Sequence, residues 1–119
     1  MNAQPTPQRR AFHRIRFPVS EQPRCLIGET SFAVVDLSET SCRISLRHHD
    51  AISLEQSLHA ILKFADGEEL RIEGQATRCE GNSVVIQLSS GVTFKKIMSL
   101  QQELHRKFPA SRDVASTNP

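Results

Sequence analysis

Five arginines near the start of this 119-residue chain are the first candidates for chemistry. Within residues 1–24 they are opposed by one acidic residue, Glu21, although the whole chain has a net charge of only +2. A guanidinium group is planar and can bind a phosphate, or the edge of a guanine, through two parallel hydrogen bonds. The cluster indicates an anion-binding arm, and a solvated basic arm is the alternative. Its members are Arg9, Arg10, Arg14, Arg16 and Arg24.

A second polar cluster follows the apolar segment 32–37. Asp36 and Ser38 are two residues apart, so both side chains project to the same face while the chain stays extended. A carboxylate can accept hydrogen bonds from N1–H and N2–H₂ of guanine, and a serine hydroxyl can bind a phosphate or a base. Taken alone, Asp-x-Ser at the end of a strand is more often a turn or a cap.

Other patterns exclude several classes of function. The sequence has no GxSxG, HExxH, Walker-type or GxGxxG motif. Three cysteines without a CxxC pair predict neither a disulfide framework nor a zinc site, and we expect buried thiols in a reducing cytoplasm. Apolar runs are far shorter than the ~20 residues of a membrane span. We therefore expect a protein that is not an enzyme and has no metal, no cofactor and no membrane span.

Period-two alternation dominates the middle of the chain and predicts β-strands. Asp66-Gly67 is typical of a tight hairpin turn, and Glu80-Gly81-Asn82 predicts a second turn. Because short turns join the strands without intervening helices, we expect a mainly antiparallel β-barrel. At least five segments show the pattern, at 32–37, 42–46, 58–64, 70–76 and 84–88.

The pattern then changes to helical spacing. Apolar residues from Phe94 to Phe108 predict an amphipathic helix over about 93–107, with its apolar stripe docked on the barrel. The fold class is therefore all-β with one C-terminal helix. The polar ends, 1–8 and 110–119, are expected to be a disordered arm and a flexible tail around one domain at 9–109.

The two polar clusters together resemble the PilZ domain family of bacterial cyclic di-GMP receptors. The signature of that family is RxxxR in an N-terminal loop, followed by [D/N]xSxxG at the end of an early barrel strand. Here the matching residues are Arg10-x-x-x-Arg14 and Asp36-x-Ser38-x-x-Ser41. The resemblance covers roughly residues 8–109. It implies a six-stranded antiparallel barrel closed by the C-terminal helix, with cyclic di-GMP as ligand, an effector protein as partner and the bacterial cytoplasm as location.

The resemblance also implies a role for each matching residue. Arg10 and Arg14 would clasp the guanines and phosphates, with Arg9 as an auxiliary contact. Asp36 and Ser38 would hold the ligand against the barrel. Because like charges repel, we expect the arm around residues 8–16 to be mobile until a dianionic ligand neutralises and orders it.

One position departs from the signature, because Ser41 stands where the family has glycine. A serine in a left-handed conformation would cost roughly 1 kcal/mol. Its Cβ would also crowd a bound guanine, and Ser41 would line the floor of the site. We therefore expect weakened rather than abolished binding of the nucleotide.

Two alternatives stay open. The first is a degenerate PilZ-like adaptor that binds partner proteins without nucleotide. The second is a basic-armed barrel that binds single-stranded nucleic acid, which the absence of Trp and Tyr and the placement of Phe32 and Phe64 in apolar rows disfavour. The sequence leaves the choice between monomer and dimer open, along with the ligand stoichiometry.

Overall fold

The computed structural model describes residues 14–47 and 50–109. The expected arm at 1–8 and tail at 110–119, as well as Arg9 and Arg10, lie outside the described residues. In the described part the elements are β1 (Ile15–Arg16), η1 (Val19–Glu21), β2 (Arg24–Ile27), β3 (Thr30–Leu37), β4 (Ser41–Ser45), β5 (Ser57–Lys63), β6 (Glu69–Glu80), β7 (Ser83–Ser90) and α2 (Phe94–Lys107).

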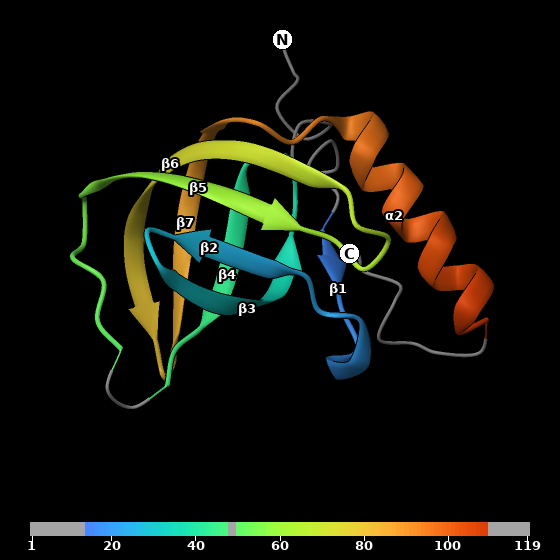
Figure 1. Cartoon of the computed structure of the whole chain (residues 1–119), viewed down its shortest axis with the longest axis horizontal. Coiled ribbons are helices and arrows are strands. Elements are labelled where there is room, and N and C mark those ends of the chain that lie inside the picture. Colours follow the sequence, from blue (N-terminus) through green and yellow to red (C-terminus); the bar gives the residue numbers. More distant parts are fainter. Residues whose placement is uncertain (1–13, 48–49, 110–119) are drawn as a thin grey trace, which may run out of the picture.

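Six strands close into a barrel (Figure 1). The pairing runs β3-β2-β5-β6-β7-β4, and β4 then pairs with β3 to complete the ring. Every pairing among these strands is antiparallel. The short strand β1 is an addition to the ring, paired with the end of β3 through Ile15–Leu37 and Arg16–Asp36. The predicted antiparallel barrel with a C-terminal helix is thus confirmed.

The five segments predicted as strands are strands β3 to β7, and two further strands were not predicted. β2 has four residues and β1 has two, which is too short for a period-two pattern to be recognised. A turn with Gly28 at φ 61° joins β2 to β3, and a left-handed backbone there suits glycine. Residues 50–56, between β4 and β5, form neither strand nor helix.

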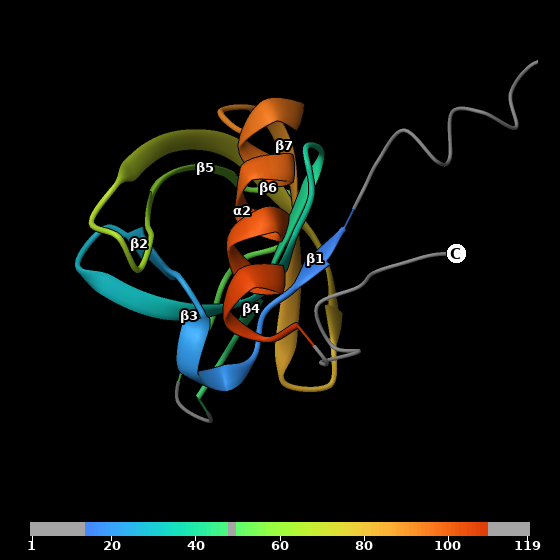
Figure 2. The same ribbon diagram turned by 90° about the vertical axis from the view of Figure 1, so that its right-hand side faces the viewer.

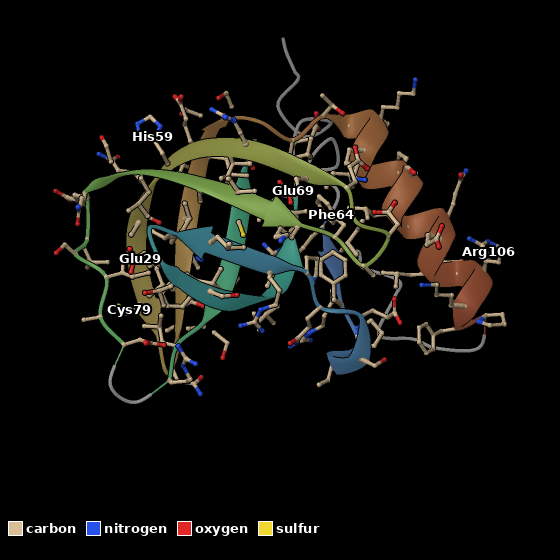
Figure 3. All side chains as sticks on the ribbon, viewed as in Figure 1. Glu29, His59, Phe64, Glu69, Cys79 and Arg106 are labelled. Carbon is tan, nitrogen blue, oxygen red and sulfur yellow. The ribbon has the colours of Figure 1, made fainter. Side chains whose placement is uncertain are left out.

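The core fills the inside of the barrel with the apolar rows that alternation predicts. Phe32 and Phe64 are both buried, so these aromatic rings are not available for stacking on a base. Cys25 and Cys42 are buried as expected. Cys79 is exposed near the end of β6, so the expectation of three buried thiols was wrong there (Figure 3).

Helix α2 lies against the side of the barrel that carries β1 (Figure 2). It begins after Thr93, whose hydroxyl accepts a hydrogen bond from the Lys96 N–H at 3.1 Å. Ile97 and Leu104 are buried on its inner face. Lys96 also lies 4.4 Å from the centre of the Phe64 ring, between helix and barrel. In the described residues no helix is long and apolar enough to cross a membrane.

Candidate functional site

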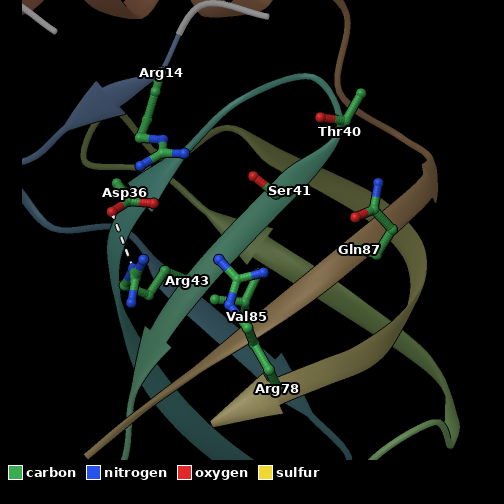
Figure 4. A pocket seen from close by; sticks show the side chains of 8 residues that line it. All are labelled: Arg14, Asp36, Thr40, Ser41, Arg43, Arg78, Val85 and Gln87. Atoms are coloured by element: carbon green, nitrogen blue, oxygen red, sulfur yellow. Dashed lines mark hydrogen bonds and ion pairs between the residues drawn. The ribbon is translucent and has the colours of Figure 1, made fainter. Parts of the chain in front are cut away.

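A pocket lies on the outer surface of the barrel, where β3, β4, β7 and β6 run side by side (Figure 4). Three guanidinium groups and one carboxylate line it, together with two hydroxyl groups and one amide. This composition suits an anion that also offers hydrogen-bond donors and acceptors. The lining residues are Arg14, Asp36, Thr40, Ser41, Arg43, Arg78, Val85 and Gln87.

The strand register brings these residues together. Asp36 on β3 pairs with Arg43 on β4, and Arg43 pairs in turn with Val85 on β7. Val85 also pairs with Arg78 on β6. Directly opposite residues in an antiparallel sheet point to the same face. One row across four strands therefore carries both arginines and the aspartate to the outer surface.

A β-bulge in β3 turns Asp36 outward. The register shifts between Val34, which pairs with Ile44, and Asp36, which pairs with Arg43. Strict alternation would place Asp36 on the inward face with Val34. The extra residue, Val35, reverses the two faces, so that Leu37 is fully buried in the core and Asp36 lines the pocket. The bulge thus directs Leu37 into the core and Asp36 into the pocket.

A network of ion pairs fixes the floor of the pocket. Arg43 Nε lies 3.3 Å from Asp36 Oδ2, and Arg43 Nη1 donates to Ser83 Oγ at 3.2 Å. Arg43 also donates to Glu80 Oε1, while Arg78 donates to the other oxygen of the same carboxylate. The carboxylate of Glu80 is therefore shared by Arg43 on β4 and Arg78 on β6.

These ion pairs shift the pKa values of Glu80 and Arg43. The hydrogen bonds from Arg78 and then from Arg43 lower the pKa of Glu80 from 4.5 to about 2. The hydrogen bond with Glu80 is the largest cause of the raised pKa of Arg43, and the charge of Asp36 adds to it. Glu80 is thus ionised at any physiological pH, and Arg43 stays positively charged.

The structure places Arg14 and Asp36, one from each polar cluster, in the same pocket. Arg14 directly precedes β1, and its side chain extends toward Asp36 in Figure 4. The pairing of β1 with β3 explains this arrangement, because Arg16 is the register partner of Asp36. Arg9 and Arg10 precede the described residues.

Ser38 lies in the turn between β3 and β4 and is almost fully buried. Its hydroxyl oxygen accepts hydrogen bonds from the N–H groups of Thr40 at 3.2 Å and Ser41 at 3.1 Å. Its own N–H donates to the Ser41 carbonyl at 2.8 Å. This is the turn-forming role that is common for Asp-x-Ser. Ser38 holds Thr40 and Ser41 in place, and those two residues line the pocket.

The expectation of a strained backbone at Ser41 was wrong. Ser41 is the first residue of β4, and among the described non-glycine residues Glu55 alone has a positive φ. A left-handed penalty therefore does not arise at this position. The side chain nevertheless lines the pocket, and its hydroxyl oxygen lies 3.1 Å from Ser38 Oγ. Compared with the glycine of the signature, Ser41 leaves less space at the floor of the pocket and adds a polar hydroxyl group there.

Sequence reasoning missed four polar lining residues. One of them, Thr40, stands between Ser38 and Ser41 of the signature. The two-residue spacing of Arg43 from Ser41 could have assigned it to the site, because both side chains project to the same face of an extended strand. Gln87 is the register partner of Ser41, which no local pattern reveals. Arg78 follows a second register shift, between Ala76 and Arg78, so alternation from the earlier part of β6 does not place it.

The lining of the pocket suits the binding of an anion. Across residues 14–47 and 50–109, no group of three or more His, Cys, Asp and Glu side chains is positioned to hold a metal ion. The arrangement can neutralise an anion and accept hydrogen bonds from a base.

Comparison with known proteins agrees with this architecture. The PilZ domain family model matches residues 8–107. The structure is similar to that of the Bacillus subtilis inhibitor of motility (MotI/DgrA), with a TM-score of 0.63 and 14% identity, over 87% of this chain and 53% of that one. The chain thus matches about half the length of MotI, and at this identity the likeness shows the fold alone.

A second solved structure, of an uncharacterised Legionella protein, matches with a TM-score of 0.49 and 16% identity, over 79% of this chain and 91% of that one. None of the curated proteins compared with the sequence matches it. The family model covers most of the chain, including the arginine cluster, the barrel and the helix. The chain belongs to the PilZ domain family.

Proposed function

We propose that this protein is a cyclic di-GMP receptor that passes the signal to an effector protein in the bacterial cytoplasm. The observation that carries the proposal is the meeting of Arg14 and Asp36 in one pocket, each from a different half of the PilZ signature. A guanidinium group binds phosphate and the O6/N7 edge of guanine, and a carboxylate accepts the N1–H and N2–H₂ donors. PilZ domains are non-catalytic receptor or adaptor domains, and we propose no reaction.

In the proposed complex each signature residue has a distinct task. Arg10 and Arg14 clasp the ligand from the N-terminal side, with Arg9 as an auxiliary contact. Asp36 binds the guanine edge against the barrel. Ser38 acts through the turn, because its hydroxyl positions Thr40 and Ser41 at the floor.

The signal is the ordering of the arginine arm. The arginines before β1 repel one another, and a dianionic ligand neutralises that repulsion when it binds between the arm and the pocket. The arm and the ligand then present a surface that an effector protein binds. Arg14 links the two, because it belongs to the arm and lines the pocket.

Calorimetric titration with cyclic di-GMP tests the proposal. We expect the wild type to bind, and Arg10→Ala and Arg14→Ala each to bind at least tenfold more weakly, the effect of losing about 1.4 kcal/mol. Arg24→Ala is a matched control, because Arg24 bonds Ser31 on the β2–β3 hairpin and does not line the pocket. The fitted stoichiometry separates one bound nucleotide from an intercalated pair.

The opposite results are equally informative. Absence of heat with the wild type at high-micromolar ligand would reject the receptor and leave the adaptor that binds protein partners without nucleotide. Tight and steeply salt-dependent retention of mixed single-stranded oligonucleotides on a filter would favour the nucleic-acid-binding barrel instead.

A further inference from the structure

Glu80 pairs with two arginines that line the pocket, Arg43 and Arg78, and neither arginine belongs to the PilZ signature. Its Oε1 accepts from Arg43 and its Oε2 accepts from Arg78. The two arginines differ in their freedom. The side chain of Arg43 is 21% exposed and has three partners, whereas that of Arg78 is 59% exposed.

We propose that Arg78 is a second phosphate-binding residue of the site and that Glu80 is the built-in anion that a ligand phosphate displaces from it. Arg43 has a positioning role, because its bonds to Asp36, Ser83 and Glu80 tie the aspartate and the glutamate to one guanidinium. The ligand class, a phosphodiester of a guanine dinucleotide, rests on the proposed function. The second phosphate site itself rests on the ion-pair geometry.

The charge balance of the pocket supports an exchange of partners. Three guanidinium groups line the pocket, against the carboxylate of Asp36 and the adjoining carboxylate of Glu80. With Glu80 in place, the excess among these pocket groups is one positive charge, which matches only one phosphate of a dianion. A phosphate that takes the place of Glu80 at Arg78 gains a full guanidinium partner without any movement of the barrel strands.

The register places Arg78 within reach of the same ligand. Asp36, Arg43, Val85 and Arg78 form one row on the outer surface, with the small apolar side chain of Val85 between the two arginines. Figure 4 shows the guanidinium groups of Arg43 and Arg78 on the same side of the sheet as Asp36 and Arg14. A dinucleotide held at Asp36 by one guanine therefore extends along this row.

Calorimetric titration with cyclic di-GMP measures both halves of the proposal. We expect Arg78→Ala to weaken binding by about fivefold and Glu80→Gln to strengthen it by about threefold, the size of one exposed charge contact. Because Glu80 acts by holding Arg78, the gain in affinity from Glu80→Gln should disappear when it is combined with Arg78→Ala. Melting curves of all variants show whether the barrel stays folded.

Two substitutions on the same strand are matched controls. Arg71→Ala removes a guanidinium group and Glu73→Gln removes a carboxylate, and neither residue lines the pocket. We expect both to bind like the wild type. The proposal is wrong if Arg78→Ala binds like Arg71→Ala, if Glu80→Gln binds like Glu73→Gln, or if the gain persists without Arg78.

A second measurement does not depend on the dinucleotide. Inorganic pyrophosphate is titrated while the Nε–Hε NMR signals of Arg78 and Arg71 are followed. A shift at Arg78 alone, larger in Glu80→Gln, supports the phosphate site even if cyclic di-GMP does not bind and the proposed function fails. Equal affinity of Arg78→Ala and Arg71→Ala for cyclic di-GMP would reject the second site and leave the proposed function intact.

Discussion

Asp36 and Arg43 face each other across β3 and β4, and Asp36 Oδ2 lies 3.3 Å from Arg43 Nε. The side chain of Asp36 is only 10% exposed, so this guanidinium group stands in for much of the water that the carboxylate has lost. The pair fixes the direction of the residue that we propose to bind guanine. The same guanidinium group also reaches Ser83 and Glu80, so one arginine organises the whole floor.

Replacing Arg43 should therefore reduce stability as well as binding. We expect Arg43→Met to lower the free energy of unfolding by about 1 kcal/mol, because a largely covered Asp36 loses its charged partner. Urea denaturation at pH 7 measures the change. Arg71→Met, on the outer face of β6, is the control and should be neutral. Equal stability of the two variants would mean that water replaces the Arg43 contact at no cost.

The shared carboxylate of Glu80 predicts a particular dependence on pH. Its pKa in the folded protein is about 2, below the ordinary 4.5, so its pairing stabilises the fold fully above pH 4.5. That contribution falls away as the pH drops from 4.5 toward 2. The wild type should be more stable than Glu80→Gln near neutral pH, and the two should converge in acid. Urea denaturation at several pH values would contradict this if the difference stayed constant.

Ser41→Gly should have opposite effects on stability and affinity. Glycine lowers the free energy of unfolding by about 0.5–1 kcal/mol, since it removes the contact with Ser38 and frees the unfolded chain. Removing a side chain from the pocket floor should at the same time tighten the binding of cyclic di-GMP. Urea denaturation and calorimetry measure the two quantities. Weaker binding of the glycine variant would mean that the serine hydroxyl contacts the ligand.

Gly74 lets β6 and β7 approach closely beside the pocket. A Cβ at this position would lie 2.3 Å from the carbonyl oxygen of Gln87, a backbone atom that cannot turn away. We therefore expect Gly74→Ala to destabilise the fold by about 1–3 kcal/mol, the cost of overpacking. Alanine in a strand would otherwise be favourable. Urea denaturation measures the free energy of unfolding of Gly74→Ala. An increase would mean that β6 and β7 move apart at little cost.

Much of the fold could be predicted because the signals were local. Five strands and the helix follow from alternation and helical spacing, and the observed helix begins at Phe94, one residue after the expected start. β1 could not be predicted from Ile15 and Arg16 alone. Two residues become a strand only when the end of β3 offers them a partner, which is a tertiary effect.

The site was harder to predict because bulges and register determine it. Asp36 was identified from its residue type, but simple alternation would have turned it into the core beside Val34. The extra residue at Val35 reverses that, and the sequence carries no signal for it. Arg78 lies beyond another such irregularity and was missed for the same reason.

The ring of six strands is closed without β1, so the pairing that positions Arg14 is separate from the pairings that hold the barrel together. β1 adds two residues to the free edge of β3, carries Arg14 at its start and packs against α2. Detaching β1 would leave every barrel pairing intact, but it would expose Ile15, which is fully buried in the core. A displacement of β1 would therefore alter the packing beside α2, while the six barrel strands would keep their partners.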